Sequence, residues 1–330
     1  MKPHNAIKTS LALFIILSFC STCLASRTEK EVKEMKYRLR PGGFITVIGD
    51  EGYINVKSWN KDEVAVKITK RAWGKNRQEA RRRLEELEIR IDHSSDELEI
   101  RLYDNYRDYD FDFWDIFDPD EWGSRGVVVD FDLMVPQEVD LRLESDEGNI
   151  EVNDIEGDIT IDIDEGDIDL EEITFKDIRI DVDEGDVDIR NAKGENGRLT
   201  VRADEGNIRF KHCECRDLDV ETDEGDVYLG DLSVRSCNVY SDEGDIEATL
   251  ETKRDDSYRI GTDEGDIYIA LPSSADIELD LETEEGRIRS DFRIDIDEYD
   301  DGERANDIIG DGDAYLEAYT SEGDIIIDRR

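Results

Sequence analysis

Residues 181–189 read Asp-Val-Asp-Glu-Gly-Asp-Val-Asp-Ile, and close variants of this stretch recur along the chain. The glycines of these repeats are Gly52, Gly148, Gly166, Gly185, Gly206, Gly225, Gly244, Gly265, Gly286 and Gly323. From Gly148 to Gly286 the successive spacings are 18, 19, 21, 19, 19, 21 and 21 residues. Self-similarity at a nearly fixed period is typical of proteins built from stacked repeats.

Apolar residues occupy fixed positions relative to each repeat glycine. In the repeat of Gly185, Ile178 and Ile180 occupy positions −7 and −5, and Val187 and Ile189 occupy positions +2 and +4. The residues between them are mostly Asp, Glu or Arg, so each half-repeat alternates apolar and polar side chains. This alternation predicts two short strands per repeat, each with one buried face.

Two short strands in one repeat favour parallel stacking of successive repeats over antiparallel hairpins. One repeat alone buries too little apolar surface to offset its ordering entropy, so neighbouring repeats must stack. We therefore expect an all-β parallel β-solenoid, or β-helix, with coils of about 20 residues. Equivalent residues of neighbouring coils would then lie about 4.8 Å apart. One predicted core ladder contains Val187, Ile208, Val227, Ile246 and Ile267.

The first 25 residues have the composition of a secretory signal peptide. Lys2 and Lys8 precede the apolar run 11–19, which is too short to cross a bilayer comfortably, and Ala25 ends a tolerable cleavage site. A retained membrane anchor is the alternative. After cleavage no later apolar run could form a transmembrane segment. We expect an exported protein that is periplasmic, on the cell surface or secreted.

The rest of the chain is predicted to form one domain. Residues 26–43 are an N-terminal lead-in, and residues 44–328 are a single β-solenoid domain with two interruptions. The first interruption, 72–126, is expected to hold a short amphipathic helix, a hairpin and an acidic, aromatic-rich loop. The second interruption, 295–313, is acidic and lacks the core pattern, so we expect a loop.

The charge of the chain limits its partners. It carries 42 Lys and Arg against 88 Asp and Glu, a formal net charge of −46. This charge argues against a nucleic acid or an anionic membrane as partner, because both attract cationic proteins. A strongly negative charge is better suited to cations, to basic partners or to an environment of concentrated salt. The partner itself, whether an envelope component, a glycan or a protein, is not identified by the sequence.

Acidic residues gather around each repeat glycine, mainly at positions −2, −1 and +1. Like charges stacked in ladders would repel, which predicts that stability at low ionic strength falls between pH 5 and pH 8 and that salt narrows the difference. No cofactor is expected, with Ca²⁺ as the alternative that the acidic corners leave open. The speculative cation ladder consists of Asp164, Asp183, Asp186, Asp204, Asp223, Asp226, Asp242, Asp245, Asp263 and Asp266.

The aromatic-rich loop is a second candidate site, for binding a partner. Exposed aromatic side chains can stack on sugars or anchor a protein, although they could instead cover an open end of the solenoid. The candidate residues are Tyr106, Tyr109, Phe111, Phe113, Trp114, Phe117 and Trp122.

Three cysteines remain after the signal peptide. The run His212-Cys213-Glu214-Cys215 looks like a metal cluster, but it lacks the second ligand pair typical of zinc sites. Cys213 and Cys237 fall on core positions, which favours buried thiols. A disulfide at Cys215 remains an alternative in an oxidising compartment.

Several phrases resemble a known family. Gly43-Phe44-Ile45-Thr46-Val47, then Gly52-Tyr53-Ile54-Asn55-Val56, a charged helix, Val135-Pro136 and repeated Gly-Asp-Ile strands are similar to the bacterial putative-adhesin domain family. The resemblance covers roughly residues 40–328. It implies a right-handed β-solenoid related to pectate-lyase-like β-helices and an exported protein of uncharacterised function. The adhesin label transfers no activity.

The function favoured by these observations is a non-enzymatic, exported cell-envelope or surface protein, an adhesin-like scaffold for binding or structure. A cation-dependent module that binds Ca²⁺ is the first alternative, although the chain lacks the glycine-rich nonapeptide of calcium β-rolls. A polysaccharide-acting β-helix enzyme is the second. No Ser-His-Asp, HExxH or GxSxG arrangement is visible in the sequence, so no catalytic residue is assigned.

Overall fold

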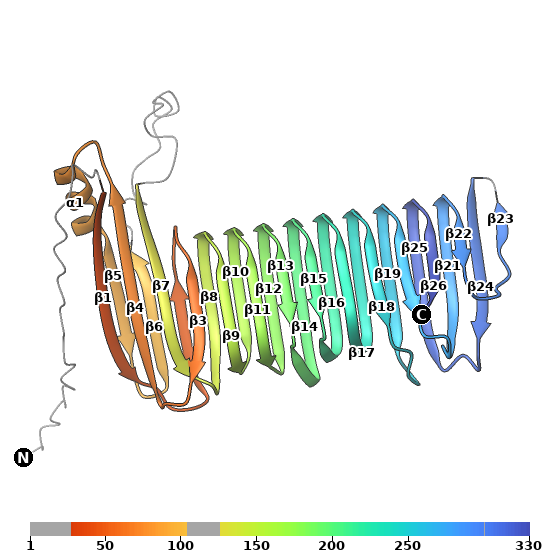
Figure 1. Ribbon diagram of the computed structural model, residues 1–330, viewed down its shortest axis with the longest axis horizontal. Coiled ribbons are helices and arrows are strands. Elements are labelled where there is room, and N and C mark those ends of the chain that lie inside the picture. Colours follow the sequence, from red (N-terminus) through yellow and green to blue (C-terminus); the bar gives the residue numbers. More distant parts are fainter. Residues whose placement is uncertain (1–27, 104–125, 300) are drawn as a thin grey trace, which may run out of the picture.

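The computed structural model describes residues 28–103, 126–299 and 301–330, and they form one elongated stack of strands (Figure 1). Strands that precede the repeat glycines lie on one face of the stack, and strands that follow them lie on the other. Through the middle of the molecule, neighbouring strands on each face are parallel. The predicted all-β architecture with parallel strands is therefore confirmed.

The pre-glycine face consists of the strands that precede the glycines and of the end strands that extend the same face. In spatial order they are β5 (Glu88–His93), β6 (Glu97–Tyr103), β2 (Gly43–Ile48), β8 (Val139–Glu147), β10 (Ile159–Glu165), β12 (Asp177–Glu184), β14 (Lys193–Glu205), β16 (Glu214–Glu224), β17 (Val227–Glu243), β19 (Ser257–Glu264), β25 (Ala314–Glu322), β21 (Ile277–Glu285), β24 (Gly302–Ile309) and β23 (Asp297–Tyr299).

The post-glycine face consists of the strands that follow the glycines, including the first part of β17, and of the end strands that extend the same face. In spatial order they are β1 (Thr28–Arg38), β4 (Glu63–Trp73), β7 (Val127–Pro136), β3 (Ile54–Trp59), β9 (Ile150–Glu156), β11 (Ile168–Thr174), β13 (Val187–Arg190), β15 (Ile208–Lys211), β17, β18 (Ile246–Leu250), β20 (Ile267–Leu271), β26 (Ile325–Arg329) and β22 (Ile288–Ser290).

The core consists of in-register apolar ladders between the two faces. The predicted ladder is confirmed, because Val187 pairs with Ile208, and the pairing continues in register through Val227 and Ile246 to Ile267. All five side chains are at most 1% exposed. At the second corner of five central coils, the residue at position +7 is buried: Ile155, Ile173, Ala192, Cys213 and Leu232. The residue before it adopts a positive φ at Asp154, Glu172, Asn191, His212 and Asp231.

Glycine at the first corner is required by packing as well as by conformation. Gly225 has a φ of 139°, which L-residues rarely adopt. A Cβ atom built on Gly225 would lie 2.1 Å from the carbonyl oxygen of Gly206 in the preceding coil. The same close approach to the neighbouring glycine recurs along the corner. The repeat glycines thus form a continuous column in which backbone packs directly on backbone.

The N-terminal end of the stack is closed by antiparallel strands and a helix. The helix α1 (Arg77–Glu86) is capped by Asn76, whose side chain accepts a hydrogen bond from the backbone N–H of Glu79. The predicted helix and the predicted hairpin, formed by β5 and β6, are both present. The lead-in contains a strand that the sequence analysis missed: β1 pairs antiparallel with β4.

The C-terminal end differs from the prediction. The segment 295–313, expected to be a loop, contains β23 and β24, and β24 pairs antiparallel with β21. Only Gly302 and Ala305 of β24 are buried, so the strand lacks the alternating apolar pattern by which the others were found. It is held instead by backbone pairing with β21 at the end of the stack.

The order of the last coils also departs from chain order. The Gly323 coil, formed by β25 and β26, lies between the Gly265 and Gly286 coils (Figure 1). Ile325 accordingly pairs with Ile267 on one side and with Ile288 on the other. The chain therefore skips one coil position and returns to fill it.

Candidate functional site

The acidic residues at position +1 form a ladder of hydrogen bonds along the glycine corner. In each step, the side-chain oxygen of one residue accepts the backbone N–H of the equivalent residue in the next coil. The bond from Asp245 N–H to Asp226 Oδ1 is 3.0 Å long, and that from Asp266 N–H to Asp245 Oδ1 is 2.8 Å. The members of this +1 ladder are Asn149, Asp167, Asp186, Asn207, Asp226, Asp245, Asp266 and Asp324.

A second ladder, which the sequence analysis missed, lies inside the same corner. Position −3 carries buried hydroxyl side chains in several coils, and four of them donate to the carbonyl oxygen of a glycine in the neighbouring coil: Ser241, Thr262, Thr283 and Thr320. Thr262 Oγ1 lies 3.1 Å from Gly244 O, and Thr320 Oγ1 lies 3.0 Å from Gly265 O. The fixed register of Ser and Thr before the glycine was the signal that could have revealed it.

The residues proposed as a cation ladder divide into two groups. Asp186, Asp226, Asp245 and Asp266 belong to the +1 ladder, where one carboxylate oxygen is already bound to a backbone N–H. The others, at position −2, are exposed at the corner: Asp164, Asp183, Asp204, Asp223, Asp242 and Asp263. Within the described residues, no three Asp, Glu, His or Cys side chains are grouped so that they could hold a metal ion.

The +1 ladder makes a prediction about Asp226. Asp226→Ala should lower the free energy of unfolding by about 1 kcal/mol, because Asp245 N–H loses its acceptor. Asp226→Asn keeps an oxygen at the Oδ1 position and should cost little, since Asn149 and Asn207 already serve the same purpose. Urea unfolding followed by circular dichroism measures both. Equal losses in the two variants would contradict the hydrogen-bond role.

Charge repulsion on the pre-glycine face centres on Asp162. It pairs in register with Glu144 on one side and Asp181 on the other. Its pKa is raised, first by desolvation and then by these two carboxylates. By contrast, the pKa of Asp186 is lowered: desolvation opposes the shift, but hydrogen bonds from Arg209 and Asn207 outweigh it.

The raised pKa of Asp162 predicts a pH-dependent effect. A carboxyl group with a raised pKa in the folded state contributes stability while it is protonated, and this contribution is lost as the pH rises through that pKa. Asp162→Asn should therefore stabilise the protein at pH 8 in low salt, by up to about 1 kcal/mol. The advantage should vanish near pH 3. Melting temperatures across this range test it, and a gain that is constant with pH would contradict it.

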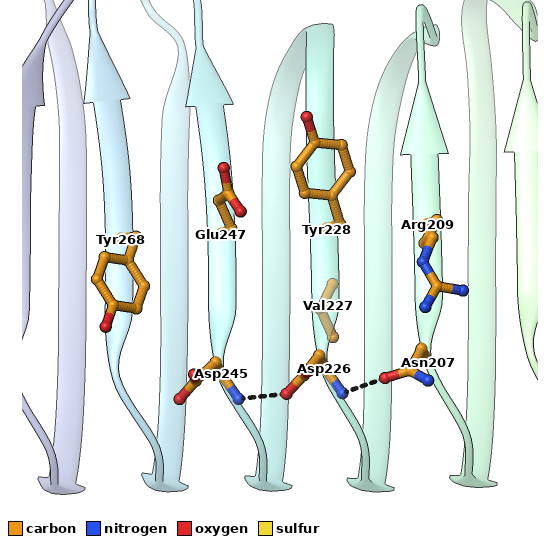
Figure 2. A pocket seen from close by; sticks show the side chains of 8 residues that line it. All are labelled: Asn207, Arg209, Asp226, Val227, Tyr228, Asp245, Glu247 and Tyr268. Carbon is orange, nitrogen blue, oxygen red and sulfur yellow. Dashed lines mark hydrogen bonds between the residues drawn. The ribbon is translucent and has the colours of Figure 1, made fainter.

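A shallow groove of about 270 Å³ lies on the outer side of the post-glycine face (Figure 2). Its centre is a row of +3 residues from adjacent strands: Tyr228 pairs in register with Glu247, and Glu247 pairs with Tyr268. The two tyrosines are 39% and 37% exposed. Arg209 lies in the next strand beyond Tyr228. The sequence analysis missed this groove, because single tyrosines at +3 carry no local pattern.

Two contacts fix the polar groups of the groove. The hydroxyl of Tyr268 donates to Asp266 Oδ2 over 2.8 Å, and this hydrogen bond, with desolvation, raises the pKa of Tyr268 to about 12. Arg209 Nη1 lies 2.8 Å from Asp186 Oδ2, in the coil on the side away from Tyr228. Asp226 and Asp245 line the groove below the tyrosines.

The three described cysteines are buried, free thiols. Cys213, Cys215 and Cys237 are 3%, 4% and 2% exposed, so the core positions predicted for Cys213 and Cys237 are correct. Burial raises the pKa of the Cys215 thiol to about 12 and raises the pKa values of the other two. The side chain of His212 is half exposed, and its Nδ1 atom lies 3.3 Å from Asp231 Oδ2. These thiols are therefore poor metal ligands at neutral pH.

The predicted partner-binding loop falls outside the described residues. Tyr106, Tyr109, Phe111, Phe113, Trp114, Phe117 and Trp122 all lie within 104–125. Tyr103, which precedes that segment, is exposed and carries the Arg90 guanidinium 4.3 Å above its ring. The role of the loop stays a prediction. In the part of the chain that the structure describes, no helix is long and apolar enough to cross a bilayer.

Comparison with known proteins gives one family match. The family described as Toastrack DUF4097 matches residues 29–328. No curated protein matches the chain.

Similar solved structures include a putative adhesin from Bacteroides fragilis, at 12% identity and a TM-score of 0.42, covering 91% of this chain and 97% of that one. A putative lipid binding protein from Parabacteroides distasonis has 11% identity and a TM-score of 0.42, covering 90% and 96%. A putative cell adhesion protein from Clostridium sporogenes has 11% identity and a TM-score of 0.21, covering 91% and 100%.

Proposed function

Because the chain belongs to the Toastrack DUF4097 family, we propose that it is a non-enzymatic, exported scaffold of the cell envelope or surface that presents its outer faces for binding. The proposal includes export through the signal peptide at 1–25. It also includes the right-handed winding and the coils of about 20 residues expected from the repeat and the resemblance.

The observation that carries this proposal is that the polar residues around the repeat glycines form hydrogen bonds between neighbouring coils. The +1 carboxylates accept backbone hydrogen bonds, and the buried −3 hydroxyls donate to glycine carbonyls. These groups hold one coil to the next, which is a structural role. A catalytic site would instead need acid, base or nucleophile groups directed at a common point. A rigid rod with flat, charged outer faces suits display and binding.

A calcium-dependent role receives less support from the same geometry. One oxygen of each +1 carboxylate is already occupied by a backbone N–H, whereas calcium takes six to eight oxygen ligands in a compact shell. The −2 carboxylates are exposed at the corner, where water and salt screen them. Comparing melting temperatures in calcium chloride and sodium chloride at matched ionic strength separates specific sites from screening.

The proposed function is tested with the chain from residue 26 to residue 330 on an array of glycans and extracellular matrix proteins. We expect at least one ligand to be retained and to be recovered chemically unchanged, as judged by mass spectrometry. Cleavage or modification of the retained ligand would contradict the non-enzymatic role. In the native host, recovery of the protein in the cytoplasmic fraction would contradict export.

A further inference from the structure

The charge of the molecule is very unevenly distributed along the stack. Residues 28–103, at its N-terminal end, contain 17 Lys and Arg and 15 Asp and Glu. Residues 126–330, which include all the coils from Gly148 onward, contain 20 Lys and Arg and 65 Asp and Glu. The coils therefore carry a strongly negative field that concentrates cations near their surface. The groove of Tyr228, Glu247 and Tyr268 lies within this part.

The two tyrosine rings of the groove are available to a cation. Figure 2 shows each ring with one face turned outward from the sheet, on either side of the strand that carries Glu247. Elsewhere the chain places its own cations over aromatic rings: Arg90 lies over the exposed Tyr103, and Lys61 lies over the partly buried Trp59. Among the described residues, no Lys or Arg lies over Tyr228 or Tyr268 in this way.

The charged groups around the rings favour a cation over a neutral ligand. Glu247 lies between the tyrosines, and Asp226 and Asp245 line the groove beneath them. The nearest cation of the chain, the guanidinium of Arg209, is bound to Asp186 on the side away from Tyr228. Aromatic faces beside a carboxylate attract an ammonium group by cation–π contact and ion pairing together. A sugar would gain from stacking on the rings but little from the negative field.

We propose that the groove formed by Tyr228, Glu247 and Tyr268 binds an alkylammonium group, with the ammonium over one tyrosine face and beside the Glu247 carboxylate. The ammonium belongs either to a lysine side chain of a basic polypeptide or to a free polyamine. This inference deepens the proposed scaffold function, because it names the chemistry that one outer face would recognise.

The test is calorimetric titration of the chain from residue 26 to residue 330 with a hexalysine peptide and, separately, with spermidine, at constant ionic strength. Tyr228→Leu should weaken binding about 5- to 10-fold, and Tyr228→Phe should leave it nearly unchanged, because the ring face is kept. Binding of hexalysine but not spermidine identifies the polypeptide source. Binding of spermidine with the same Tyr228 dependence identifies a free amine as sufficient.

A matched pair of variants distinguishes binding at the groove from attraction by the overall negative charge of the coils. Glu247→Gln and Glu151→Gln each remove one carboxylate at position +3 of the post-glycine face, but the neighbours of Glu151 in register are Asn55 and Asp169. We expect about a 5-fold weakening from Glu247→Gln and less than 2-fold from Glu151→Gln. Equal effects of the two variants would overturn the proposal in favour of unspecific attraction.

Two further results would also overturn the proposed ammonium site. Failure of both amines to bind, or retention of a neutral oligosaccharide that depends on Tyr228 and not on Glu247, would overturn the ammonium site. Neither result would overturn the scaffold function, which fails if the array retains no ligand, if its ligands are chemically altered or if the protein stays in the cytoplasm. Unchanged circular dichroism of each variant shows that a loss of binding is not a loss of fold.

Discussion

Val227→Asp should lower the free energy of unfolding by roughly 3–5 kcal/mol, the range expected when an uncompensated charge is left in a protein interior. Val227 is 1% exposed and lies between Ile208 and Ile246 in the core ladder. An aspartate there would have apolar side chains on both sides along the stack. Urea or thermal unfolding, followed by circular dichroism, measures the loss.

Val32→Asp is the matched control for this prediction. Val32 is 39% exposed on β1, the strand at the N-terminal end of the stack, so the same substitution should change stability by less than about 1 kcal/mol. If Val227→Asp unfolds like the unchanged protein, the register of the core ladder is wrong. If Val32→Asp is equally damaging, the effect arises from added negative charge and not from burial.

Gly225→Ala should be strongly destabilising although it adds only one methyl group, costing roughly 3 kcal/mol. Two effects add. A φ of 139° is unfavourable for alanine, and the new Cβ would lie 2.1 Å from the carbonyl oxygen of Gly206. Relief of that overlap requires the two coils to separate locally, which would weaken the hydrogen bonds between them.

Two further glycines separate these effects. Gly42 has a φ of 71° with nothing within 4 Å of a new Cβ, so Gly42→Ala should show only the conformational cost, about 1 kcal/mol. Gly261 lies in β19, and its nearest neighbour would be 3.4 Å away, so Gly261→Ala should be neutral or slightly stabilising. A loss at Gly225 no larger than that at Gly42 would contradict the close packing of the glycine column.

The sequence was sufficient for the repetitive part of the fold, because each strand there carries its own alternating pattern. Ile178, Ile180, Val187 and Ile189 show the burial expected from their distances to Gly185. The ends of the stack were harder to predict. β1 mixes Lys and Glu on its outer positions with few apolar residues, and β24 has only one buried apolar residue, so local patterns do not mark them as strands.

The order of the last coils could not be read from the sequence for a related reason. The Gly286 and Gly323 repeats present equivalent apolar residues at +2, Ile288 and Ile325, so either could stack on the Gly265 coil. Their order depends on long-range pairing. The same holds for the groove, because Tyr228, Glu247 and Tyr268 become neighbours only through the register of three coils.

The acidic corners were recognised, but their role was assigned incompletely. The sequence analysis treated the aspartates at −2 and +1 as one group, a speculative cation ladder whose like charges repel. The structure distinguishes the two positions, because the +1 side chain reaches the backbone N–H of the next coil. Two positions of the +1 ladder carry asparagine, Asn149 and Asn207, whose Oδ1 atoms accept the same hydrogen bond without a charge. The presence of asparagine in the sequence therefore indicated a hydrogen-bonding role for position +1.

Distances between spin labels on the post-glycine face test the stacked-coil register most directly. One label is placed at Glu151 and the second at Glu247, Ile326 or Arg289, all at position +3; the native thiols are buried and label slowly. Pairing in register separates these sites from Glu151 by five, seven and eight strand steps. At about 4.8 Å a step, we predict backbone separations of about 24, 34 and 38 Å. Distances that do not increase by one strand spacing per coil would contradict the stacked register, and a longer distance to Ile326 than to Arg289 would contradict the inserted Gly323 coil.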